Sequence, residues 1–193
     1  MKLALNLLFL ILFSLNLFAQ TPAKKAVLFL IAPKDFRDEE FSIPYETLKK
    51  LGYKITIASY DTLTAIGMLG MKVKPDKRVK DIDTNAFQAL VVVGGSGARI
   101  FFDDTTIHKI VRHFSKKKIL AAICISPLTL LRAGVLKGKK ATVWKDEKII
   151  AEFKKQGAKY QALDVVRDGN ILTASGPSAA KKFASELVKM LKE

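Results

Sequence analysis

The sequence has 193 residues, 49% of them hydrophobic, and a formal net charge of +15. This length fits one domain with a core of its own, and the single cysteine, Cys124, excludes an internal disulfide. The lysines are scattered and no arginines alternate with aromatic residues, so the charge does not indicate a base-stacking surface, and we expect no nucleic-acid partner.

The N-terminus has the pattern of an export signal. A lysine is followed by an uncharged apolar run over residues 3–18 and then by a small residue. We therefore predict a signal peptide at 1–19, a short leader at 20–24 and a single domain at 25–193. We expect the exported protein to be periplasmic and to meet anionic envelope surfaces, with which its positive charge favours association. The apolar run also approaches the length of a membrane span, so a retained N-terminal anchor is the alternative.

The domain opens with a strand–helix–strand pattern. Residues 26–32 form a continuous apolar run, which is typical of a parallel strand buried on both faces. Residues 38–51 have apolar positions at helical spacing and end at Gly52, and residues 54–59 predict the second strand. This order predicts a doubly wound α/β fold. The segment 61–83 is irregular. Two short strands are expected within it, at residues 63–66 and 71–73.

The middle of the chain indicates neither a nucleotide cofactor nor a metal. A buried strand at 89–93 ends in the glycine-rich loop 94–97, where backbone N–H groups could approach an anion, although a plain turn explains the glycines equally well. No nucleotide fingerprint follows. The helix expected at 103–117 carries His108 and His113, whose spacing of five does not place them on one helix face as metal ligands require.

Cys124 lies at a sharp turn between a strand and a helix. Residues 119–123 predict a buried strand, whereas Ser126 and Pro127 suit the N-cap and first position of a helix that ends near Gly134. Such an elbow exposes the side chain at the end of the sheet, and the helix N-terminus favours a thiolate with a pKa below about 8.5. The alternative is that Cys124 is a small buried hydrophobic residue.

The C-terminal part completes an alternating pattern. A strand is expected at 140–143, a helix at 146–156, and a hairpin at 165–173 around an Asp-Gly turn. A last helix begins with residues 175–177. Four of its residues are expected to face the core: Ala179, Phe183, Leu187 and Leu191.

Four blocks together resemble the ThiJ/PfpI superfamily, the family of the Parkinson-disease-associated protein deglycase. The blocks are Glu40–Pro44, Val93–Gly95, Ala121–Pro127, and Gly169–Thr173 with Gly176–Pro177. The resemblance covers about residues 24–193. It implies a flavodoxin-like three-layer sandwich, related to the class I glutamine amidotransferases, with a central mainly parallel sheet and a cysteine nucleophile elbow. A homodimer is also implied.

The resemblance also implies roles for individual residues. Cys124 matches the nucleophilic or redox-sensing cysteine, and Glu40 matches the protonated glutamate that hydrogen-bonds its sulfur. The alternative for Glu40 is an ordinary exposed helix carboxylate, like Glu39. The backbone N–H groups of Gly95 and Ile125 match the donors that stabilise an oxyanion. No cofactor and no metal are implied.

The sequence departs from the family pattern where the protease-like branch has its histidine. The residue after Cys124 is Ile125, and the later position that carries a histidine in other members falls near Trp144. Three positions before the glutamate, where family members often have an acidic residue, this sequence has Arg37. Since a Cys-His dyad is absent, we expect membership of the deglycase and chaperone-like branch and no peptidase activity.

Three functions are compatible with these residues. The first is an enzyme in which Cys124 adds to a small electrophile, such as methylglyoxal or a glycated adduct, while Glu40 moves the proton. The second is an oxidative-stress sensor or redox-sensitive chaperone, with Cys124 oxidised to a sulfinate. The third is a degenerate member retained for binding at the cell envelope.

Overall fold

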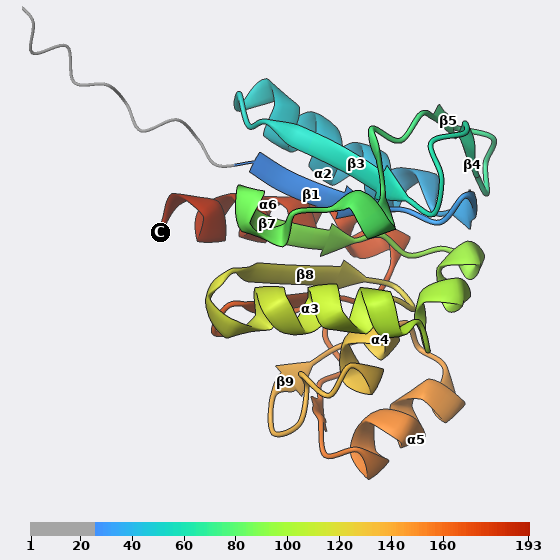
Figure 1. The fold of residues 1–193 in the computed structure, drawn as a ribbon. Helices are drawn as coiled ribbons and strands as arrows, with labels where there is room; N and C mark the ends of the chain where they lie inside the picture. The colour runs from blue at the N-terminus through green and yellow to red at the C-terminus, as the bar shows by residue number, and fades with distance from the viewer. Residues whose placement is uncertain (1–25) are drawn as a thin grey trace, which may run out of the picture.

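A seven-stranded sheet forms the centre of the protein in the computed structural model, which describes residues 26–193 (Figure 1). The strand order is β11-β12-β8-β7-β1-β3-β6, and every neighbouring pair is parallel except β11 with β12. The strands are β1 (Ala26–Leu30), β3 (Ile55–Ser59), β6 (Lys77–Arg78), β7 (Phe87–Val92), β8 (Ile119–Ile123), β11 (Val165–Asp168) and β12 (Ile171–Ala174).

Helices cover both faces of this sheet and make it the middle of three layers. Helices α2 (Asp38–Lys50) and α6 (Ala180–Lys192) pack together behind the sheet in Figure 1, whereas α3 (Thr105–Lys117) lies in front of β8. The short α4 (Pro127–Arg132) packs between α3 and α5 (Glu147–Lys155). Short 3₁₀ helices are η1 (Val79–Asp81), η2 (Thr84–Ala86), η3 (Ser96–Phe101) and η4 (Pro177–Ala179). The predicted flavodoxin-like α/β class is confirmed.

A small three-stranded sheet projects beside the carboxyl ends of the main strands. It consists of β2 (Lys34–Phe36), β4 (Ala65–Gly67) and β5 (Lys72–Val73). The sequence analysis missed β2, because a segment that begins after a proline has no strand pattern until it pairs with β4. We call residues 65–73 the flap. The buried Asp38 carboxylate fixes the flap by accepting hydrogen bonds from the N–H groups of Leu69 (2.9 Å) and Met71 (2.8 Å).

The C-terminal elements differ in detail from expectation. The strand expected at 140–143 is shorter, because only Lys140–Ala141 (β9) pairs with the unforeseen β10 (Lys159–Tyr160). In α6, Phe183 and Leu187 are buried as predicted, as is Ala179 just before the helix, but Met190 is buried more completely than Leu191.

The predicted signal peptide (1–19) and leader (20–24) lie outside the described residues. Within residues 26–193, no helix has both the length and the apolar character that crossing a membrane requires.

Candidate active site

Cys124 occupies a strained turn at the carboxyl end of β8. Its φ is 64°, in the left-handed region that residues other than glycine seldom adopt. Both of its backbone polar groups are held, since the Cys124 N–H donates to the Ala174 carbonyl (2.9 Å) and the Trp144 N–H donates to the Cys124 carbonyl (2.8 Å). Such strain persists only where surrounding contacts enforce it, and it is concentrated at functional sites.

The helix that follows the cysteine is shorter than the sequence indicated, and it lacks the predicted side-chain N-cap. Helix α4 has only six residues, and the Ser126 side chain makes no N-cap hydrogen bond. The Ser126 hydroxyl instead donates to the Val93 carbonyl at 2.8 Å, which ties the elbow to the end of β7. The predicted side-chain cap is therefore wrong, because a buried acceptor on the neighbouring strand binds the hydroxyl.

The Glu40 carboxyl is buried against the elbow. Its side chain is fully buried, and a Cβ added at Gly94 would overlap both the Glu40 carboxyl and the Cys124 side chain. Neither carboxyl oxygen has a partner with good hydrogen-bond geometry, although the Cys124 thiol and the Gly94 backbone lie close enough to influence its ionisation. Burial raises the pKa of Glu40 to about 8, so the carboxyl keeps its proton at neutral pH.

The adjacent Glu39 has a different role. It is half-buried and pairs with Arg37, whose Nε lies 2.8 Å from a carboxylate oxygen of Glu39. Of the two consecutive glutamates in the first turn of α2, only Glu40 faces the cysteine. The alternative that Glu40 is an exposed helix carboxylate is therefore excluded.

Burial also acts on the thiol itself. With Glu40 ionised, burial raises the pKa of Cys124 to about 12, repulsion from the carboxylate adds to this, and the backbone N–H groups of Gly95 and Ile125 oppose it. The predicted thiol pKa below about 8.5 is therefore wrong for this ionisation state. The sequence revealed the turn but not the burial of the sulfur or the carboxyl beside it.

The glycine-rich loop is shaped by close backbone packing. Gly95 has φ 99°, and a Cβ there would overlap the backbone of β2 at Asp35 and of the following Arg37. The Arg37 N–H donates to the Gly94 carbonyl at 3.0 Å. This packing holds the Gly95 N–H toward the sulfur, so the structure brings together the four predicted site residues: Cys124, Glu40, Gly95 and Ile125.

A pocket of about 240 Å³ opens onto the sulfur of Cys124. The Cys124 residue leaves 8% of its surface exposed. The pocket walls are mainly apolar, with three charged groups among the lining residues. The lining residues are Arg37, Met68, Gly95, Ser96, Arg99, Cys124, Ile125, Trp144, Asp146, Ile149 and Pro177. The volume admits a small molecule.

The sequence analysis did not identify several of these wall residues. Met68 comes from the flap, Arg99 from η3, and Asp146 and Ile149 from the start of α5. No local pattern marked them, because they meet the elbow only in the folded chain. In the part of the chain that the structure describes, no histidine lines this pocket.

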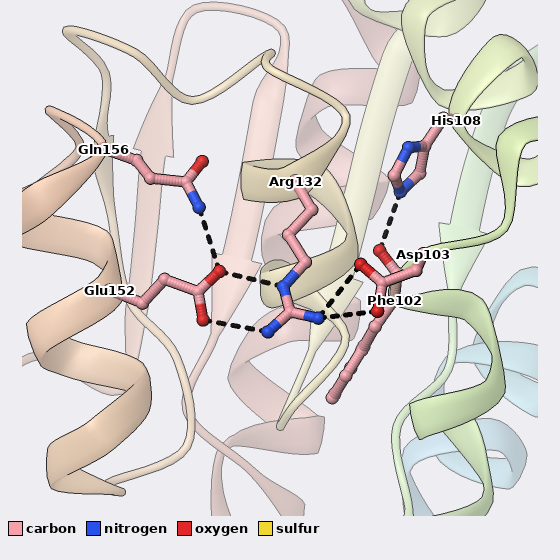
Figure 2. A network of polar contacts seen from close by, with 6 residues as sticks. All are labelled: Phe102, Asp103, His108, Arg132, Glu152 and Gln156. Atoms are coloured by element: carbon pink, nitrogen blue, oxygen red, sulfur yellow. Dashed lines mark hydrogen bonds and ion pairs between the residues drawn. The ribbon is translucent and has the colours of Figure 1, made fainter.

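An ion-pair network holds the pocket wall formed by α5 (Figure 2). The Arg132 guanidinium pairs with Glu152 of α5 (Nε to Oε1, 2.8 Å) and with Asp103 just before α3 (Nη1 to Oδ2, 2.8 Å). Gln156 donates to Glu152, and His108 contacts the Phe102 carbonyl at 2.8 Å. His108 is thus structural, and the network fixes α5 against the elbow helix.

The chain is similar to known proteins over most of its length. Residues 25–190 match the DJ-1/PfpI family. The chain is 41% identical to an uncharacterised protein of Methanocaldococcus jannaschii (86% of this chain, 82% of that protein) and 35% identical to a deglycase of Pyrococcus horikoshii (86% and 99%). A ThiJ/PfpI domain protein from Brachyspira murdochii superposes with a TM-score of 0.83 at 28% identity, covering 88% of this chain and 97% of that one.

Proposed function

Because the chain belongs to the DJ-1/PfpI family, we propose that it is a cysteine-dependent enzyme of the glyoxalase or deglycase type. Its substrates would be small α-oxoaldehydes, such as methylglyoxal, or the adducts that they form with amino groups. The observation that carries the proposal is the buried, unpartnered Glu40 carboxyl beside Cys124, at a pocket of small-molecule size. The 35% identity to a deglycase of Pyrococcus horikoshii supports the same class of chemistry for this chain.

The first step would be addition of sulfur to the aldehyde carbon. In the reactive form the Glu40–Cys124 pair has lost one proton, which burial of Glu40 delays until about pH 8. The proton that remains lies on Glu40, so the sulfur attacks as a thiolate. As the carbon–sulfur bond forms, the carbonyl oxygen becomes an alkoxide. The N–H groups of Gly95 and Ile125 stabilise this charge, and Glu40 donates a proton to give a neutral hemithioacetal.

The following steps would use Glu40 as a proton carrier. As a carboxylate it removes the proton from the former aldehyde carbon and returns it to the neighbouring carbon, while the hydroxyl proton passes to the neighbouring oxygen. These transfers convert the hemithioacetal into the thioester of a 2-hydroxy acid. Water then hydrolyses the thioester, releases the acid and restores the thiol. One α-oxoaldehyde and one water give one 2-hydroxy acid, with no external oxidant or reductant.

The decisive experiment measures 2-hydroxy acid formed from methylglyoxal. We expect Cys124→Ser and Glu40→Gln each to lower kcat by at least about a hundredfold, the usual scale of acid–base catalysis. Glu39→Gln is the matched control, because it alters the adjacent carboxylate that faces away, and it should retain activity within about twofold. Turnover that survives Cys124→Ser would refute the proposal.

Oxidation sensing is the second candidate, because a protonated Glu40 could donate a hydrogen bond to a Cys124 sulfinate. Dilute peroxide should then oxidise Cys124 to the sulfinate, which has two added oxygens, and oxidise the sulfinate to the sulfonate only slowly. We expect the sulfinate to accumulate in Glu40→Gln as in the wild type, and to be oxidised further in Glu40→Leu, as measured by intact mass. Equal oxidation in both variants would remove Glu40 from this role and leave the enzymatic proposal standing alone.

A further inference from the structure

The fold places two different surfaces at opposite edges of the main sheet. The pocket lies where the parallel strands end, because Cys124 directly follows β8. Helices α2, α3 and α6 run back from that edge and end where the strands begin, near the C-terminus in Figure 1. Strand β1 also begins there. The chain preceding residue 26 therefore joins the domain at the edge opposite the pocket.

Exposed lysines gather at the edge where the strands begin. They come from the last turns of three helices and from the residue before β3. We call this surface the basic edge, and it consists of Lys49, Lys50, Lys54, Lys116, Lys117 and Lys192. Among the described residues, none of the six forms an ion pair.

Two carboxylates at the C-terminal end of the chain do not neutralise these lysines, since they already have partners of their own. Glu193 pairs with Arg167, and Glu186 is held by Lys189 and Arg167. Helix-terminal lysines do compensate helix dipoles, which explains five of the six positions one at a time. Dipole compensation explains neither Lys54, which lies outside a helix, nor the sequence that enters this edge.

The sequence that enters the basic edge is itself suited to a membrane. Lys24 and Lys25 directly precede β1 and add two positive charges, and the uncharged apolar run at 3–18 lies a few residues earlier. Leu51, at the end of α2, leaves 38% of its surface exposed beside Lys50. Positive charge and an exposed apolar side chain thus share this edge of the described domain, and the sequence before β1 leads into the same edge.

We propose that the basic edge docks on an anionic lipid membrane, with the Cys124 pocket facing away from the lipid. Lysines near such a surface are attracted by its negative potential, and the attraction decreases as salt screens it. The inference rests on the charge of this edge, the exposed Leu51 and the sequence that leads into it, so it stands whether or not the proposed catalysis is correct.

The test compares full-length protein on vesicles of phosphatidylcholine alone and of phosphatidylcholine mixed equally with phosphatidylglycerol. The apolar run sets the binding to neutral vesicles, so the ratio of the two affinities isolates the charge contribution. We expect a preference of roughly tenfold or more for anionic vesicles, and its decrease with added salt. The variant Lys50→Glu/Lys116→Glu/Lys192→Glu should lose most of this preference.

The matched control is Lys72→Glu/Lys74→Glu/Lys77→Glu, which makes the same charge change on exposed lysines of the flap, of the segment that follows it and of β6. It should keep the preference, and circular dichroism should show both variants folded. Equal loss in the control, no preference in the wild type, or tighter binding to duplex DNA than to anionic vesicles would overturn the proposal. Slower alkylation of Cys124 by iodoacetamide on vesicles than in solution would overturn the orientation.

Discussion

At the scale of single residues, the site depends on a carboxylic acid kept neutral by burial. Glu40 is placed by Gly94, whose missing side chain allows the carboxyl to lie against Cys124. A buried carboxyl without a well-formed hydrogen bond costs folding free energy, so its presence is better explained by function than by stability. The same burial makes the stability of the protein depend on pH.

The free energy of unfolding should fall as pH rises from about 4.5 to about 8. Glu40 keeps its proton in the folded state up to about pH 8, whereas an unfolded glutamate loses it near 4.5. Between these values the folded state binds one more proton, so raising the pH favours unfolding by up to about 1.4 kcal/mol per unit. Urea unfolding at several pH values should show this slope in the wild type and in Glu39→Gln, but not in Glu40→Gln. The same slope in Glu40→Gln would contradict the assignment.

The Glu40→Gln variant should also lower the pKa of Cys124 below its value of about 12. Glutamine removes the carboxylate charge and offers an N–H donor to the sulfur, and both changes favour the thiolate. An ultraviolet titration of the thiolate measures the shift directly. A value unchanged from the wild type would mean that burial alone controls the thiol.

At the scale of elements, the elbow is supported by segments that contact it only in three dimensions. The flap supplies Met68 and is itself held by Asp38, two residues before Glu40 in α2. Helix α5 supplies Ile149 and is held by Arg132 of α4 (Figure 2). The two walls of the pocket can therefore be altered separately.

We expect Arg132→Met to destabilise the fold by about 1 kcal/mol and to raise KM more than it lowers kcat. The methionine keeps an apolar stem over Phe102 but removes the paired hydrogen bonds to Glu152, so the wall formed by α5 loosens while Cys124 is untouched. Arg78→Met, which breaks the exposed pair with Asp81, is the control and should change stability by less than about 0.5 kcal/mol. Denaturant unfolding and steady-state kinetics measure both effects, and equal losses in the two variants would contradict this role.

At the scale of the whole molecule, the pocket and the basic edge lie at opposite ends of the strands. This arrangement agrees with the proposed export, in which the preceding sequence leads to or from a membrane. We expect the mature protein to begin near residue 20 and to fractionate outside the cytoplasm, as N-terminal sequencing can establish. Residue 1 retained on soluble protein would refute cleavage.

Two further whole-molecule expectations follow from the family resemblance. The homodimer remains a prediction, and light scattering of the purified protein should give twice the mass of one chain. Cleavage of casein is not expected, because no histidine lines the pocket in the described part of the chain. Proteolysis that disappears in Cys124→Ala would show that another base serves the thiol.

The sequence by itself determined most strands of the main sheet, the main helices and the position of the elbow. These features depend on short-range patterns: the apolar runs of β1, β7 and β8, the helical spacing in α3 and α6, and the strand that ends at Cys124. Each pattern lies within one segment, where burial and backbone preference act on neighbouring residues. The family resemblance then singled out Glu40.

Only the tertiary structure decided what surrounds the sulfur. It showed that Glu40 turns inward while Glu39 pairs with Arg37, and that Ser126 donates to Val93 instead of capping α4. It also reversed the expected direction of the thiol pKa. The physical reason is that desolvation and hydrogen-bond partners depend on segments far apart in the chain. No local pattern in the sequence specifies which of several polar groups those segments will enclose.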